Sequence, residues 1–138
     1  MLSSDDLYKL AKCRYEEAKV LAKNNKPDGA TYLCGYALEL ILKRRISLHL
    51  DWSDGYPENN NDFNKKQSFK THDLGDLLHL SGLEQKIKKD VSMFAYWQIA
   101  KTWQVEQRYK RVGEKNESEM SSIIDATREV LNWIIKHE

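Results

Sequence analysis

The chain has 138 residues, 41% of them hydrophobic and 31% charged, which predicts one soluble globular domain over residues 1–138. Its formal net charge of +1 neither predicts nor excludes a nucleic-acid partner, because a local basic patch is enough to bind one. No apolar run approaches the roughly 20 residues that a membrane helix needs. The first residues lack the apolar core of a signal peptide. We therefore expect a cytoplasmic protein without a membrane partner.

The first half of the chain shows hydrophobic periodicity typical of helices, and no segment alternates with period two. The first expected helix begins near Ser3 and ends before Pro27, and the second runs from about Asp28 to His49. The expected buried stripe of the first helix is Leu7, Leu10, Ala11, Ala18, Leu21 and Ala22. Cys13 and Cys34 lie among apolar residues of these helices, which predicts two buried free thiols.

The second half begins with a polar, Asn-rich segment over residues 50–70 that has no periodicity. A structureless loop of about 20 residues is unusual in a compact domain and is commonly functional or disordered. We expect Thr71 to cap a short helix from His72 to about Leu80.

Further helix is expected from Leu83 to about Tyr109, with a break near Asp90 left open as an alternative. Ser118 is the expected cap of the last helix, whose apolar residues recur at helical spacing. Together these elements predict an all-α fold, an antiparallel up-and-down four-helix bundle with an extra short helix and a long polar loop over about 50–70.

Glu39 is the most informative residue, because the helix around it is apolar nearly all round. An ionised carboxylate in the centre of a bundle is costly unless it is paired and hydrogen-bonded. Two partners are open. One is Lys43, one turn later on the same helix face. The other is Arg108, far away in sequence.

The segment around Arg108 offers groups that recognise anions. Its guanidinium is planar and permanently charged, and it suits a carboxylate or a phosphate. Trp103 and Tyr109 would supply a stacking wall beside it, with Glu106 as a further polar group. The structural alternative is a core Trp103, a solvated Glu106 and an Arg108 that ends a helix.

His72 is the candidate for acid–base chemistry, because capping does not explain it and imidazole titrates near neutral pH. The structural alternative is a polar residue hydrogen-bonded to the bundle. Asp73 suits the first turn of the short helix. No HxxxH or CxxC spacing appears, so we predict no metal site. We also predict no cofactor, because the chain has no glycine-rich phosphate loop.

Basic residues gather in three places and are usually solvated at helix ends. The groups are Lys43, Arg44 and Arg45; Lys65, Lys66 and Lys70; and Arg108, Lys110 and Arg111. If the 50–70 loop folds over the Arg108 region, the groups would merge into one surface that attracts phosphate.

Three blocks, read in order, cover nearly the whole chain. They are residues 28–43 with Gly35-Tyr36-Ala37-Leu38-Glu39-Leu40 and Lys43, then Lys70-Thr71-His72-Asp73-Leu74, then Trp103, Glu106 and Arg108-Tyr109. In this order and spacing the chain resembles a bacterial HEPN-domain protein. The resemblance implies an antiparallel four-helix bundle, often a homodimer, that is tied to RNA. Many such proteins are metal-independent endoribonucleases of toxin–antitoxin or phage-defence systems, some beside a nucleotidyltransferase-type antitoxin, and others are non-catalytic.

One departure from the family decides between its functions. Catalytic members carry an Arg, four to six residues and then a His late in the bundle, whereas Arg108 is followed by Val112, Gly113 and Glu114. The only literal match, Arg44 to His49, ends the second helix. We therefore expect an RNA- or nucleotide-binding HEPN-type domain. The first alternative is an active ribonuclease that uses His72 and Arg108 with Glu39. The second is a structural, partner-binding bundle.

Overall fold

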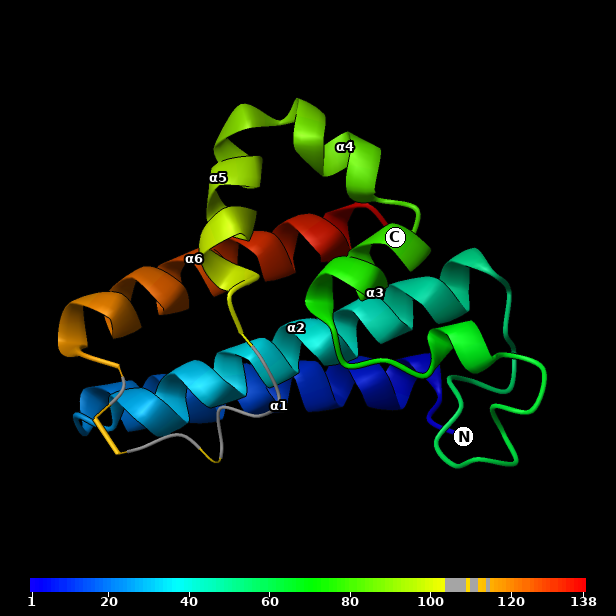
Figure 1. The fold of residues 1–138 in the computed structure, drawn as a ribbon, viewed down its shortest axis with the longest axis horizontal. Helices are drawn as coiled ribbons and strands as arrows, with labels where there is room; N and C mark the ends of the chain where they lie inside the picture. The colour runs from blue at the N-terminus through cyan, green and yellow to red at the C-terminus, as the bar shows by residue number, and fades with distance from the viewer. Residues whose placement is uncertain (104–108, 110–111, 114) are drawn as a thin grey trace.

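The computed structural model describes residues 1–103, 109, 112–113 and 115–138, and among them every regular element is a helix. One isolated antiparallel bridge joins Leu2 to Tyr56. The all-α prediction is confirmed (Figure 1). The elements are α1 (Ser4–Lys23), α2 (Pro27–His49), η1 (Gln67–Phe69), α3 (Leu74–Leu80), α4 (Glu84–Lys89), α5 (Val91–Ala100) and α6 (Glu117–Lys136).

The two N-terminal helices form where the sequence predicts them. Ser3 caps α1 by accepting a hydrogen bond from the backbone N–H of Asp6, and the acidic first turn suits the helix dipole. The chain reverses at Asn25, whose φ is +56°, and α2 starts at Pro27. Proline is favoured there because its missing N–H has no partner inside the helix.

α2 is the centre of the fold. It packs against α1, α6 and α3, and α5 packs on α6. Following the colours of Figure 1, α2 and α6 run in the same direction and α1 runs opposite to both. Burial on so many sides is what an apolar helix without a polar face requires. Within the described part of the chain, no helix combines the length and apolarity needed to cross a membrane.

Two helices begin at other residues than expected. Asp73, not Thr71, caps α3 through a 2.8 Å hydrogen bond from the N–H of Asp76. The Thr71 hydroxyl instead accepts from the N–H of Asp73 at 3.1 Å, so it braces the cap. Asn116, not Ser118, caps α6 in the same way. In both helices the N-cap is an Asp or Asn that lies two residues from the expected Thr or Ser.

The described part of the expected helix over residues 83–109 contains two short helices, α4 and α5. The break left open near Asp90 is present, and the Asp90 side chain caps α5 by accepting from the N–H of Met93 at 3.1 Å. α5 ends at Ala100, so its expected continuation through Trp103 is wrong. The hydroxyl of Thr102 bonds the carbonyl of Ile99 at 3.0 Å in the turn that follows. In Figure 1, α5 stands across α6 and not alongside it.

The polar loop between α2 and α3 is not structureless, which corrects the expectation. Its aromatic side chains Trp52, Tyr56, Phe63 and Phe69 pack against the core. Tyr56 is fully buried, and its hydroxyl donates a 2.6 Å hydrogen bond to the carbonyl of Phe69. The loop therefore has a small apolar core of its own, which fixes its backbone against α1 and α2.

The two cysteines have different surroundings. Cys34 is buried, as expected, and its burial raises the pKa of the thiol to about 11. Cys13 is exposed, so the expectation of a second buried thiol is wrong. It lies two residues after Ala11 and two before Tyr15, both buried, and successive helical positions separated by two do not share a face.

The difference predicts selective thiol chemistry. At pH 8 a disulfide reagent should modify one thiol per native chain, because only a small fraction of Cys34 is thiolate and its sulfur is shielded. Full denaturation should expose the second thiol to the reagent. The absorbance of the thiolate that the reagent releases gives the number of modified thiols. A Cys13→Ser protein that still reacts rapidly in the native state would contradict the assignment.

Candidate functional site

Glu39 lies on α2 among apolar residues, and its side chain is only 3% exposed. It accepts a 2.8 Å hydrogen bond from Nδ1 of His72 and lies 3.4 Å from Nζ of Lys43. The pairing with Lys43 that the helical spacing predicts is confirmed. The other expected partner, Arg108, lies outside the described residues. The buried carboxylate is thus held from its own helix and from the residue two positions before α3.

His72 is positioned by the start of α3, because the Thr71–Asp73 cap fixes the backbone on both sides of it. Its side chain is 58% exposed although its partner carboxylate is buried. A bond from Nδ1 to a carboxylate sets the tautomer, so that Nε2 carries the lone pair in the neutral ring. Nε2 has no hydrogen bond to another described residue. The exposed nitrogen can accept a proton or, in the charged ring, donate one.

Tyr56 completes what we call the Glu39 cluster, which is Glu39, Lys43, His72 and Tyr56. Nζ of Lys43 lies 5.3 Å from the centroid of the Tyr56 ring, a cation–π distance. Burial, and secondarily the negative charge of Glu39, raises the pKa of Tyr56 far above its ordinary value. The phenol therefore stays protonated and holds the loop through Phe69. Among these residues, His72 is the one with acid–base capacity at the surface.

An aromatic stack continues from the cluster along the loop. The Trp52 ring lies 4.8 Å from Phe69 and 5.7 Å from Tyr56, and Nζ of Lys66 lies 4.6 Å above Trp52. Trp52 is half-buried, so part of its ring is accessible. The sequence interpretation missed these residues. The signal was present as four aromatic side chains within an otherwise polar segment.

Other predicted site residues lie around the cluster. Lys70 is exposed, and its Nζ donates to the side-chain carbonyl of Asn60 at 2.6 Å. One carboxylate oxygen of Asp73 is used as the cap of α3. Tyr109 is exposed, and Glu106, like Arg108, lies outside the described residues.

Trp103 is part of the core, as the sequence analysis proposed in its alternative to a stacking wall beside Arg108. It is buried, and its ring lies 5.8 Å from Tyr32 and 6.0 Å from Tyr36. It packs directly over Gly35 of α2, where a Cβ atom would lie 1.9 Å from Cγ of the indole. Only glycine leaves room for this contact, which draws the chain after α5 back onto α2.

The basic run at the end of α2 is not a solvated patch. Arg44 pairs with Glu138, and its guanidinium carbon lies 4.8 Å from the centroid of the Tyr8 ring. Arg45 donates to the carbonyls of Ser81 at 3.2 Å and His137 at 2.9 Å. Both arginines therefore tie the end of α2 to neighbouring segments and are not free to bind phosphate.

The start of α2 is fastened by Asp28, whose role the sequence interpretation did not foresee. Its two carboxylate oxygens accept backbone hydrogen bonds from Gly113 at 2.7 Å and Lys115 at 3.0 Å. Gly113 has a φ of +90°, which favours glycine. These bonds hold Gly113 and Lys115, which precede α6, against the start of α2.

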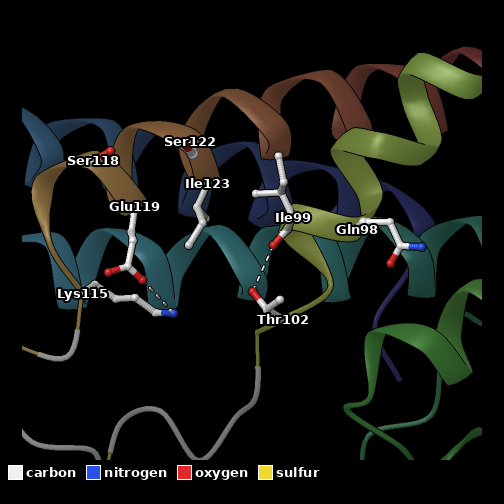
Figure 2. A pocket seen from close by; sticks show the side chains of 8 residues that line it. All are labelled: Gln98, Ile99, Thr102, Lys115, Ser118, Glu119, Ser122 and Ile123. Carbon is white, nitrogen blue, oxygen red and sulfur yellow. Dashed lines mark hydrogen bonds and ion pairs between the residues drawn. The ribbon is translucent and has the colours of Figure 1, made fainter.

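A separate shallow groove of about 470 Å³ lies between the end of α5 and the start of α6 (Figure 2). It shares no residue with the Glu39 cluster, and Lys115 and Glu119 form an ion pair of 3.9 Å at its edge. Its lining residues are Gln98, Ile99, Thr102, Lys115, Ser118, Glu119, Ser122 and Ile123. Within the described ranges, no three His, Cys, Asp or Glu side chains are grouped so as to hold a metal ion.

Replacing Gly35 tests the contact with Trp103. Gly35→Ala should lower the free energy of unfolding by about 1–3 kcal/mol, because overpacking outweighs the better helix propensity of alanine. The matched control is Gly29→Ala on the same helix, where the new Cβ would meet only the flexible end of Leu21 at 3.1 Å. Urea unfolding measures both. A Gly35→Ala protein as stable as the control would show that Trp103 does not pack there.

Removing the Glu39 carboxylate tests the cluster. Glu39→Ala should lower the free energy of unfolding by about 3 kcal/mol, because the amine of Lys43 then stays largely buried without its partner. It should also shift His72 away from the Nδ1-protonated tautomer, which 15N NMR reports. Glu16→Ala, which removes an exposed ion pair with Lys19, should change stability by no more than about 0.5 kcal/mol. Equal stability of the two variants would refute a buried, paired Glu39.

Comparison with known proteins gives no relative from which a function can be transferred. No protein-family model matches the chain, and neither does a curated protein or a solved structure. The case for a function therefore rests on the residues of the cluster and their surroundings.

Proposed function

We propose that this protein is a HEPN-type RNA- or nucleotide-binding domain of a cytoplasmic toxin–antitoxin, phage-defence or stress system. The observation that carries the proposal is the 2.8 Å bond between the buried Glu39 carboxylate and the mostly exposed imidazole of His72. The pair with Lys43 accounts for one oxygen of this carboxylate, and the other oxygen holds an imidazole that is mostly in solvent. An arrangement that buries a charge in order to orient a surface imidazole suits a site better than a core.

The surroundings of His72 supply what a nucleotide requires. Its Nε2 can bond a phosphate oxygen or a ribose hydroxyl. Lys66 and Lys70, on the same loop, add positive charge for the phosphate backbone. A base can stack on the half-buried Trp52 ring where the ammonium of Lys66 now lies over it, and such contacts tolerate any sequence. The expected binding face is therefore the Glu39 cluster together with the aromatic stack of the loop.

The proposal includes the architecture that the resemblance implies, an antiparallel up-and-down four-helix bundle. In it α1, α2 and α6 supply three helices, and α5 takes the fourth position although it packs across α6 and not alongside it. The proposal also takes over a homodimer and a nucleotidyltransferase-type antitoxin as partners. Arg108, Glu106 and Tyr109 are the further RNA contacts in this scheme.

A second candidate is a metal-independent endoribonuclease, and the carboxylate–imidazole pair favours it specifically. A histidine oriented by a carboxylate through Nδ1 is the arrangement of a general base. Nε2 of His72 would take the proton of a ribose 2′-hydroxyl, whose oxygen attacks the adjacent phosphorus. The bond from phosphorus to the 5′-oxygen of the next nucleotide breaks, that oxygen takes a proton from water, and a 2′,3′-cyclic phosphate remains. Arg108 would stabilise the charge on the phosphorane.

Binding is tested with a fluorescein-labelled single-stranded RNA and fluorescence anisotropy. His72→Ala and Trp52→Ala should each weaken binding by about fivefold or more, since each removes one polar or stacking contact worth at least 1 kcal/mol. The matched control is His79→Ala, an exposed histidine on α3 outside the cluster. The proposal fails if the parent protein does not bind, or if the two histidine variants lose the same affinity.

Cleavage separates the two candidates. The purified protein is incubated with a mixed RNA pool in EDTA, beside His72→Ala and Arg108→Ala. Intact RNA with retained binding is the result expected for a binding domain. Cleavage by the parent that both variants lose would replace it with the ribonuclease.

A further inference from the structure

An apolar stripe on α5 faces solvent. The helix carries few polar residues, and it buries Trp97 and Ala100 against the rest of the molecule. On its opposite side Val91 is 83% exposed and Ile99 is 39% exposed, and the exposed Ala95 lies between them. Positions i, i+4 and i+8 form one line along a helix. We call Val91, Ala95 and Ile99 the α5 stripe.

Positive charge lies at both ends of the α5 stripe. Lys86, Lys88 and Lys89 of α4 precede it, and Lys101 follows it. Lys88 is paired with Glu84 at 3.6 Å. The other three are exposed and form no ion pair with a described residue. The nearby carboxylate of Asp90 is used to cap α5.

The α5 stripe opens into the groove described above. Ile99 belongs to both, and Ile123 of α6 supplies the apolar wall opposite (Figure 2). Gln98, Thr102 and Ser122 add polar groups around them. A row of apolar residues that ends in a hollow with a polar rim is the form of surface that receives an amphipathic helix.

We propose that the α5 stripe and its groove dock an amphipathic helix of a partner protein whose apolar residues are flanked at both ends by acidic side chains. The charge at the two ends selects this occupant. A second copy of α5 would bring lysines against lysines in a parallel arrangement and also in an antiparallel one, and like charges at an interface cost affinity. A membrane surface would need a broad apolar face, whereas the aromatic side chains of α5 are buried or half-buried. This inference is independent of the Glu39 cluster.

Two synthetic helical peptides of equal length test the proposal. Both carry leucines at i, i+4 and i+8, one with glutamates at its two ends and the other with lysines. The acidic peptide should bind the full chain about tenfold more tightly at low salt, and the preference should shrink as salt screens the charges. Lys86→Glu combined with Lys89→Glu should abolish or reverse the preference. Fluorescence anisotropy measures each affinity.

Variants of the α5 stripe locate the contact. Val91→Ser and Ile99→Ser should each weaken the acidic peptide about fivefold, whereas Val20→Ser, an exposed valine on α1, should leave it unchanged. All three positions are at the surface, and circular dichroism verifies the folds. Equal binding of the two peptides, no binding at all, or the same loss in Val20→Ser would overturn the proposal.

Two further measurements identify a wrong occupant. A dimer in sedimentation velocity that Val91→Ser dissociates would assign the α5 stripe to a second copy and overturn the proposal. Binding to phosphatidylserine vesicles that Ile99→Ser abolishes would assign it to a membrane, with the same consequence. A monomeric protein that ignores vesicles and binds the acidic peptide is the expected result.

Discussion

The burial of the Glu39 carboxylate is the constraint on which the rest of the structure depends. α2 has no polar face, so it must be covered by α1, α3 and α6, and a charge inside that shell needs partners from within reach. Lys43 comes from the same helix, and His72 from the end of the long loop. The pair therefore fixes where the loop ends and where α3 begins. Burial, and secondarily the charge of Glu39, raises the pKa of the neighbouring Tyr56, whose phenol donates to the carbonyl of Phe69 and holds the loop.

Asp28 and Arg45 bond the two ends of α2 to neighbouring segments. Asp28 holds the approach to α6 at one end, and Arg45 bonds the carbonyls of Ser81 and His137 at the other. These groups satisfy backbone donors and acceptors that water would otherwise have to satisfy. Arg44 and Arg45 are already paired with groups of the protein, so the positive charge for a phosphate ligand has to come from other residues. The lysines of the loop are the described cations nearest in sequence to His72.

The sequence predicts α2 well because Pro27 marks its start and its apolar pattern is continuous, and it predicts the Glu39–Lys43 pair because that contact is local. His72 could be named as a candidate, but its pairing with Glu39 joins residues 33 positions apart, and local spacing carries no such information. The caps of α3 and α6 were misplaced because two eligible residues compete within two positions. The end of α5 was missed because Trp103 turns away to pack on Gly35, a tertiary contact that overrides helix propensity.

That last contact also links the two candidate surfaces. Trp103 follows α5 by three residues and lies against Gly35, which is one helical turn before Glu39 on α2. A partner that displaces α5 would therefore change the contact between the Trp103 indole and the α2 backbone at Gly35. Packed interiors transmit such displacements because they contain few voids to absorb them.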